Sequence, residues 1–399
     1  MAEKKTALQK DFFLYQAQTT AFASAFEVSH AAGNYIYDKN GKAFLDFASG
    51  VSANTLGHSH PRILKAIHEQ VDKHLHVMVY GEYALEKPVA LCKKLATLLP
   101  EPLETTYLVN SGAEAIDASI KLAKRVTGRG EIISAKMAYH GNTHGALSVS
   151  GNEDFKRAFR PLLPDIQFIE FNNFDDIDKI TSQTAGVLLE TIQGAAGFIQ
   201  PMHGWLKAVK DKCEKVGALL ILDEIQPGFG RTGKLFAFEH YDVVPDILVM
   251  GKGMAGGMPI GAFTARYEHM KQLQSNPKLG HITTFGGNPV VAAAALAVLE
   301  ELSESHLIAQ TLLKEKLFRE LLVHPGIKSL PGKGLMLAPE LSSPEITLEL
   351  AKKCMEKGLI VFWLLYEVQF LRITPPLTIT EDEIKKGCEI ILESLEEMS

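Results

Sequence analysis

The sequence has few cysteines, no excess of positive charge and no long hydrophobic run. The four cysteines lie far apart without a Cys-x-x-Cys pair, which argues against a zinc knuckle and indicates a reducing compartment. The 41 Lys and Arg residues are outnumbered by 47 Asp and Glu and are scattered, which disfavours a polyanion-binding role. The longest apolar run, Val290 to Leu299, is far shorter than the roughly 20 residues of a membrane-spanning helix.

The remaining composition is that of a globular protein. The chain has 399 residues, of which 46% are hydrophobic and 22% charged, so it can bury two or three cores at about 150 residues per domain. Residues 1–13 contain no apolar signal core, and they lack the arginines of a transit peptide. We therefore expect a cytoplasmic protein.

The pattern along the chain predicts an α/β fold. Residues 34–47 alternate apolar and polar side chains around Lys39-Asn40-Gly41, which is typical of a β-hairpin, and a helix begins at Pro61. From about residue 105, short apolar strands alternate with amphipathic helices, which indicates a mostly parallel sheet covered by helices. The strands are expected at 106–110, 131–135, 166–171, 187–190, 218–223 and 247–251, with helices at 114–126 and 203–216.

The pattern changes after Val290 to an α+β order. We expect a helix at 312–322, a strand at 334–341, a helix starting at Ser343-Pro344, another strand, and a last helix that opens with the capping box Thr380-x-x-Glu383. A second domain is therefore predicted to begin near residue 290.

Several glycine clusters raise the possibility of a phosphate site. Gly228-x-Gly230-x-x-Gly233 and Gly251-x-Gly253-x-x-Gly256 match the dinucleotide fingerprint, but neither opens a helix, and Leu235 stands where a Walker A motif needs Ser or Thr. A better candidate is residues 110–113, between a strand and a helix, where free N–H groups and the Ser111 hydroxyl would converge on one phosphate. The alternative is that Ser111 is an ordinary helix cap.

Two further candidates follow buried strands. Asp223 ends an apolar strand, so it suits a protonated ring nitrogen, and Gln226 suits a phenolic oxygen; the alternative is a capping or turn carboxylate. Lys252 lies between glycines after another apolar strand, where burial would lower its pKa and allow a Schiff base; the alternative is a solvated loop lysine. A Schiff-base lysine, a carboxylate and a site for one phosphate are together what pyridoxal phosphate needs from a protein.

The chain resembles the class III pyridoxal-phosphate-dependent aminotransferases, which include the acetylornithine, ornithine and 4-aminobutyrate enzymes. The resemblance runs from about Gly33 to Pro376 and rests on the order and spacing of NSGAEA, YHG, ETIQG, LDEIQPGFGRTG, GKGMAGGMPIGA, TTFGGNP and RITPPL. It implies fold type I, with a seven-stranded large domain at 71–289 and a small α+β domain formed by 1–70 and 290–399. It also implies a homodimer with shared active sites.

The resemblance assigns roles to single positions. Lys252 resembles the Schiff-base lysine that also carries the proton, Asp223 the partner of the pyridine nitrogen and Gln226 the donor to the ring hydroxyl. Ser111, Gly112 and Ala113 match the phosphate cradle, although the family often has Thr in place of Ala113. Thr284 resembles the residue that reaches the phosphate of the neighbouring subunit's cofactor.

The same comparison supplies the rest of the site. Tyr139 and Ile225 resemble the residues on the two faces of the cofactor ring, although Tyr139 could be ordinary core. His140 and Glu190 belong to matching motifs and are expected among the cofactor-binding residues. Arg372 resembles the arginine that binds a substrate carboxylate, a task that suits its bidentate fork.

Two positions depart from the family. Ala195 replaces a Glu that pairs with the carboxylate-binding arginine in the ω-aminotransferase members, and Asn142 replaces an Arg that holds a distal carboxylate. Arg372 is then left unpaired as the main carboxylate clamp. Either another basic residue, for example in the N-terminal segment, takes over, or the amino donor is different.

The sequence thus predicts an enzyme of amino-acid metabolism that moves an amino group from an amino acid to a 2-oxo acid by a ping-pong mechanism. The donor is expected to be an ornithine-like or acetylornithine-like amine, or else another ω- or β-amino acid. The alternatives are an aminomutase or decarboxylase on the same scaffold, and a degenerate binding protein. No metal is expected, because the pair His140 and His144 lacks a third ligand and the glycines at 141 and 145 argue against a helix there.

Overall fold

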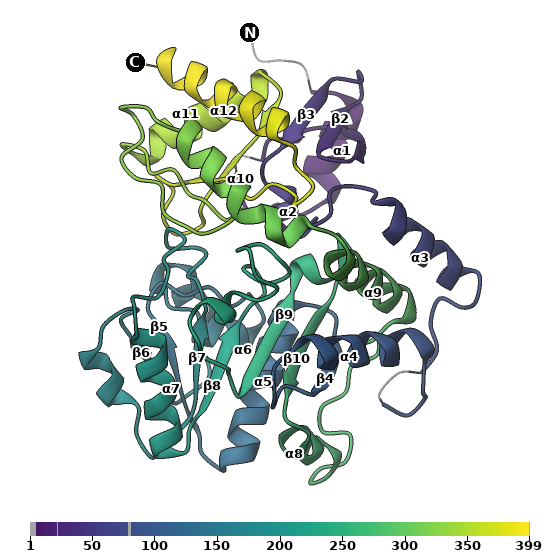
Figure 1. Ribbon diagram of the computed structural model, residues 1–399, viewed down its shortest axis with the longest axis vertical. Coiled ribbons are helices and arrows are strands. Elements are labelled where there is room, and N and C mark those ends of the chain that lie inside the picture. Colours follow the sequence, from purple (N-terminus) through teal and green to yellow (C-terminus); the bar gives the residue numbers. More distant parts are fainter. Residues whose placement is uncertain (1–4, 22, 79–80, 399) are drawn as a thin grey trace.

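The computed structural model describes residues 5–21, 23–78 and 81–398, and its centre is a seven-stranded sheet (Figure 1). The strand order is β4-β10-β9-β8-β7-β5-β6, in which β10 is antiparallel to both neighbours and the other pairs are parallel. The predicted mostly parallel sheet is confirmed. The strands are β4 (Thr105–Val109), β5 (Glu131–Ala135), β6 (Ile166–Ile169), β7 (Thr184–Glu190), β8 (Leu219–Asp223), β9 (Ile247–Gly251) and β10 (Gly261–Ala265).

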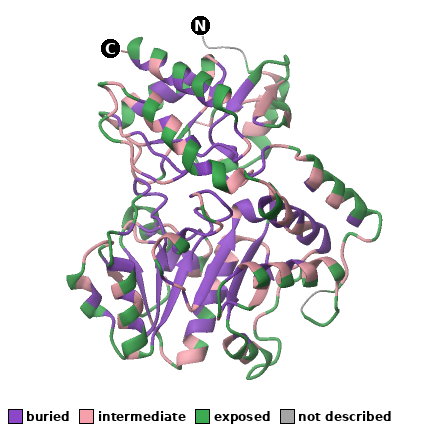
Figure 2. Cartoon of the chain, viewed as in Figure 1, coloured by how far each residue is buried: buried purple, intermediate pink, exposed green. Residues whose placement is uncertain are grey.

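The three central strands are buried on both faces because helices cover the sheet. Every residue of β7, β8 and β9 is buried, and Figure 2 shows this buried layer between helices with exposed outer faces. The main covering helices are α5 (Gly112–Thr127) and α7 (Trp205–Val216), whose apolar residues face the strands. Sheets of this kind bind ligands at the carboxyl ends of their strands, so the polar residues there decide the chemistry.

The two ends of the chain meet in a second, smaller sheet. The hairpin β2 (Tyr35–Asp38) and β3 (Ala43–Asp46) forms as predicted, β1 (Val28–Ala32) pairs with β2, and β11 (Leu359–Ile360) pairs in parallel with β3. Both termini lie at this end of the molecule (Figure 1). The proposed domain boundaries near residues 70 and 290 stay a prediction.

Helices pack around this smaller sheet and beside the large one. Thr380 and Glu383 form the expected capping box at the start of α12. The helices α3, α4 and α9 pack together along one side of the large sheet. The bounds are α1 (Ala7–Tyr15), α3 (Pro61–Val71), α4 (Glu86–Leu98), α8 (Tyr267–Met270), α9 (Pro289–Glu304), α10 (Leu307–Leu321), α11 (Pro344–Glu356) and α12 (Glu381–Glu396). None of the helices in the described ranges is long and apolar enough to cross a membrane.

The predicted strand at 334–341 is wrong. This segment is buried, but it makes only isolated bridges, such as those of Leu337 with Gly332 and with Ile373. Pro339 has no N–H to donate to a ladder, and Gly334 adopts a φ of +62°, which turns the chain out of the extended conformation. The apolar run in the sequence therefore reflects burial of the segment, not strand pairing.

Candidate active site

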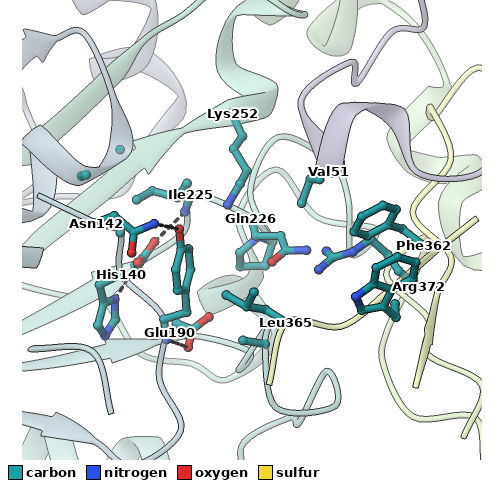
Figure 3. A pocket seen from close by; sticks show the side chains of 18 residues that line it. Val51, His140, Asn142, Glu190, Ile225, Gln226, Lys252, Phe362, Leu365 and Arg372 are labelled. Carbon is teal, nitrogen blue, oxygen red and sulfur yellow. Dashed lines mark hydrogen bonds and ion pairs between the residues drawn. The ribbon is translucent and has the colours of Figure 1, made fainter. Parts of the chain in front are cut away.

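A cavity of about 390 Å³ lies at the carboxyl ends of β7, β8 and β9 (Figure 3). The parallel register places Glu190 of β7 opposite Asp223 of β8, and Lys252 directly follows β9. Three residues that are distant in the sequence thus reach one edge of the sheet. The predicted site residues that line the cavity are Gly112, Ala113, Tyr139, His140, Glu190, Asp223, Ile225, Gln226, Lys252 and Arg372.

Asp223 is held in place by two hydrogen bonds at the end of β8. Its Oδ2 accepts from His140 Nδ1 at 2.8 Å, and its Oδ1 accepts from the Ile225 N–H at 2.9 Å. Asp223 and His140 are both buried. These two bonds fix a carboxylate that lines the cavity. The alternative of a capping or turn carboxylate accounts only for Oδ1, which accepts from the Ile225 N–H.

Lys252 lies in an unusual backbone conformation after β9. Its φ of +42° is in the left-handed region, which a residue with a side chain seldom adopts, and Gly253 follows in close contact with Thr55. Burial lowers the pKa of Lys252, the Arg372 charge lowers it as well, and the charges of Asp223 and Glu190 raise it. The side chain points into the cavity (Figure 3), so the alternative of a solvated loop lysine is excluded.

Glu190 is a buried carboxyl group that connects two loops. It accepts from the Gly194 N–H at 2.9 Å and from the Tyr139 N–H at 3.0 Å. Burial raises the pKa of Glu190 to about 7, Asp223 adds to the shift and His140 opposes it. Glu190 thereby fixes the backbone of Tyr139. The Tyr139 side chain lines the cavity, and its hydroxyl oxygen accepts from Asn142 Nδ2 at 3.3 Å.

Gln226 and Ile225 lie beside Asp223, and glycines make room for both. Gln226 Nε2 is 3.5 Å from Ser52 Oγ, and a Cβ on Gly194 would come within 2.3 Å of Gln226 Oε1. A Cβ on Gly112 would lie 2.7 Å from Ile225 Cδ1. These glycines therefore set the position of the two side chains.

The predicted phosphate cradle is the start of α5. The Ser111 hydroxyl accepts from the Glu114 N–H at 3.2 Å, so Ser111 is a helix cap, as the alternative had it. The hydroxyl proton is still available, and Gly112 and Ala113 begin the helix beside the cavity, where N–H groups lack a carbonyl one turn earlier. Ser111 and Thr284 do not line this cavity, so their predicted roles stay predictions.

Arg372 is a buried guanidinium with unused donors. It is only 5% exposed, and burial lowers its pKa to about 10. Its Nε and Nη1 have no hydrogen-bond partner in the described part of the chain, and its Cζ lies 5.6 Å from the centre of the Phe198 ring. Buried guanidinium groups need an anion, so Arg372 is arranged for a ligand.

The rest of the cavity near Arg372 is apolar, and of its residues the sequence pointed only to Ala195. It is lined by Val51, Phe362, Trp363 and Leu365, with Ala195 and Pro227. Phe362 and Trp363 form β12, a two-residue strand that pairs with β13 (Leu371–Arg372), and a strand this short leaves no periodic signal. Val51 belongs to Ser49–Ser52 (α2), where every φ is positive, and no sequence pattern indicates that conformation.

The histidines near the cavity have protein partners. His140 Nδ1 donates to Asp223, and His144 Nε2 donates to the Pro161 carbonyl at 2.7 Å. No helix joins His140 to His144, as expected, because α6 spans only His144–Val149 with Thr143 as its cap; Gly145 nevertheless lies inside this helix. Its Gly145 is required for contact with α5, since a Cβ there would lie 2.2 Å from Asp117 Oδ1. The described ranges contain no group of three His, Cys, Asp or Glu that could hold a metal.

Comparisons with known proteins cover almost the whole chain. Residues 15–395 match the model of the family Aminotransferase class-III. The acetylornithine aminotransferase of Archaeoglobus fulgidus is 36% identical over 366 residues, which are 92% of this chain and 94% of that protein. The [LysW]-aminoadipate semialdehyde/glutamate semialdehyde transaminase of Sulfurisphaera tokodaii is 35% identical over 78% of this chain and 81% of its own length.

A solved structure shares the fold as well. The ornithine aminotransferase from Toxoplasma gondii ME49 superimposes with a TM-score of 0.90 at 30% identity, covering 100% of this chain and 97% of that chain.

Proposed function

The chain belongs to the class III aminotransferase family, and from this we propose that the cavity between Lys252 and Arg372 is where it transfers amino groups. Its members depend on pyridoxal phosphate, so the predicted family, fold class, enzyme class and cofactor are confirmed. The relatives reported above are aminotransferases, and they give no support to an aminomutase or decarboxylase. The roles of single residues and the identity of the substrates are the proposal.

The residues of the cavity fit the cofactor. Gly141, at a φ of +129°, has no room for a Cβ, which would lie 2.6 Å from the Cβ of Ala113, so the loop fits closely against the start of α5. The N–H groups of Gly112 and Ala113 would bind the phosphate. Asp223 would hold the ring nitrogen and Gln226 the ring hydroxyl, with Tyr139 and Ile225 on the two faces of the ring. When bound, the cofactor withdraws electrons from the carbon that carries the amino group.

Lys252 would hold the cofactor covalently through Nζ and move the proton of the reaction. Both tasks need an uncharged amine, and burial together with the Arg372 charge favours this form by lowering the pKa of Lys252. The His140 ring keeps Asp223 oriented, because its Nδ1 donates to the carboxylate. Lys252 thus acts as base and then as acid between two carbon positions.

Arg372 is the observation that carries the proposal. It is a buried cation with unused donors, and it lies in the same cavity as Lys252, so a carboxylate bound there would present a nearby amine to Nζ. We infer a donor of the acetylornithine type, which has one carboxylate and, apart from the reacting amine, no second charge. The amino group would then pass to a 2-oxo acid in a second half-reaction that uses the same cavity.

We also propose a homodimer. An apolar groove lies beside the segment that carries Thr284, and its lining includes Tyr83, Val89 and Leu108. Val89 is 56% exposed, as is the neighbouring Phe285, which is unusual for side chains of this size unless a surface covers them. A second copy of the chain would cover them and bring its Thr284 towards the cavity, and light scattering after size exclusion would measure the mass.

The test is the substitution Lys252→Met, with Lys314→Met as the matched control. Lys314 is another buried lysine, and its Nζ donates to the Leu377 carbonyl. It does not line the cavity. After borohydride reduction, mass spectrometry should find the cofactor attached to the wild type and the control but not to the Lys252 variant. Oxo-product formation from N-acetylornithine should be lost in the same variant only, and turnover above background there would contradict the mechanism.

A further inference from the structure

Apart from the reacting lysine, the cavity presents to a substrate one cation, Arg372, and an apolar wall formed by Val51, Phe362, Trp363 and Leu365. Resting on the proposed function, we infer that the amino acceptor is a 2-oxo acid with a single carboxylate and an apolar side chain, and not a dicarboxylic 2-oxo acid. Arg372 would bind its carboxylate, and Val51, Phe362, Trp363 and Leu365 would contact its side chain.

The cavity has one cation that is free to bind a substrate carboxylate. In the described part of the chain, Lys252 and Arg372 are the only Lys and Arg residues among those that line the cavity, and Lys252 is required for the reaction. Arg372 has free donors for one carboxylate, with both Nε and Nη1 unpartnered. The predicted alternative, a second basic residue from the N-terminal segment, does not occur among the described residues that line the cavity. A second carboxylate would therefore find no positive partner in this chain.

The side of the cavity formed by Val51, Phe362, Trp363 and Leu365 is apolar. Phe362, directly opposite Arg372 across the β12–β13 ribbon, stacks on Trp363 with ring centres 4.2 Å apart. Phe362 is 44% exposed and Leu365 40% exposed, although both line the cavity, so they present apolar surface that no described residue covers. Figure 3 shows Phe362 and Val51 on the Arg372 side of the cavity, with Leu365 between Glu190 and Arg372. Such a surface gains free energy when it contacts apolar groups and loses it when it desolvates a charge.

The backbone of Val51 lies in the left-handed region. Four consecutive residues, Ser49–Ser52, have positive φ, and Val51 among them is β-branched, which makes its φ of +59° costly. A strained conformation persists where the surrounding structure requires it, and here it places a valine at the cavity. A glycine or asparagine would adopt this conformation at lower cost, so the valine side chain itself is the part that serves the site.

The proposed reaction balances without another reagent. In the first half, the donor carbon is oxidised by two electrons: it loses its amino group and one hydrogen and gains a carbonyl oxygen from water. In the second half, the acceptor carbon is reduced by two electrons: its carbonyl oxygen leaves as water, and it gains the same amino group and one hydrogen. The acceptor keeps its single carboxylate on Arg372 throughout.

The test compares two acceptors of equal length. The cofactor-loaded enzyme is treated with N-acetylornithine, freed of donor, and mixed with 2-oxovalerate, which has one carboxylate, or with 2-oxoglutarate, which has two. The amino acid formed is quantified to obtain kcat/KM. We expect 2-oxovalerate to be preferred by roughly tenfold to a hundredfold, the range over which sites reject a group that they leave unpaired.

A variant supplies the missing cation. Leu365→Lys places an ammonium group on a partly exposed position of the wall, and it should raise kcat/KM for 2-oxoglutarate relative to 2-oxovalerate by about tenfold. Val323→Lys is the control, which adds the same ammonium group at a 75% exposed position that does not line the cavity and should leave the ratio unchanged. Calorimetry on the cofactor-free protein gives a second readout, in which valerate should bind more tightly than glutarate.

The outcomes separate the two proposals. If the wild type uses 2-oxoglutarate as well as or better than 2-oxovalerate, a second cation reaches the cavity from elsewhere and the inference is wrong, while amino transfer stands. If neither acid receives the amino group although the donor releases its oxo product, the proposed function fails with it.

Discussion

Replacing Asp223 with Asn separates the charge of this residue from its shape. Asp223 makes two buried hydrogen bonds, with His140 Nδ1 and with the Ile225 N–H. An Asn can keep the bond from Ile225, and its amide can donate to His140 if the ring moves its proton to Nε2, which faces Ser134 Oγ at 3.4 Å. The variant therefore removes one negative charge and leaves the local structure intact.

The expected loss is large in catalysis and small in stability. Removing one preorganised electrostatic group from a reacting centre costs about 3–4 kcal/mol of activation free energy, which corresponds to a rate decrease on the order of 10²–10³-fold. Stopped-flow absorbance of the donor half-reaction would measure the rate, and thermal unfolding followed by circular dichroism would measure stability. The unfolding temperature should change by only a few degrees, since the Asn can keep both hydrogen bonds.

Asp246→Asn is the matched control. Asp246 directly precedes the central strand β9. It accepts from the Leu220 N–H at 2.8 Å and from Lys210 Nζ at 2.9 Å, but it does not line the cavity. Its variant should lose stability and keep the rate. A rate for Asp223→Asn within threefold of the wild type would refute the reasoning, because the charge would then have no part in the reaction.

Three further predictions concern groups around the site and the core. Burial raises the pKa of Glu190 from 4.5 to about 7, so its contribution to the free energy of unfolding is full below pH 4.5 and is lost, by about 3 kcal/mol, as the pH rises through 7. The unfolding temperature of cofactor-free Glu190→Gln minus that of the cofactor-free wild type should therefore increase from pH 5 to pH 8. A difference that does not change with pH would contradict the burial argument. Gly194→Ala places a Cβ 2.3 Å from Gln226 Oε1, so this side chain must move, and we expect at least a tenfold lower kcat with little change in unfolding temperature, whereas unchanged kinetics would show that Gln226 is not needed where it lies. Gly387→Ala brings a Cβ within 2.0 Å of the buried Phe47 ring, and chemical denaturation should show a decrease of about 1–3 kcal/mol in the free energy of unfolding. An unchanged free energy of unfolding would show that the Phe47 ring moves aside without cost.

The residues that the sequence predicted well are those at the ends of buried strands. Asp223 and Lys252 follow apolar runs, and the parallel register then brings such strand ends to one edge without further information. Arg372 came only from the resemblance, since a two-residue strand has no periodicity of its own.

The apolar wall could not be predicted because its members depend on tertiary structure. Val51 reaches the cavity through a left-handed turn, and Phe362 does so because β12 pairs with β13. The helix at His144–Val149 was missed for a similar reason: glycine is a poor helix former in isolation, and the contact with Asp117 that favours Gly145 lies in another element.

The parallel pairing of β3 with β11 has a consequence for how a newly made chain acquires its activity. The hairpin is translated before the large sheet, but its sheet partner at Leu359 and Ile360 is translated after it. By then the strands that carry Asp223 and Lys252 have emerged, together with the start of α5. The smaller sheet and the ribbon that carries Phe362 and Arg372 can therefore be completed only after the cofactor-binding edge of the large sheet has been translated.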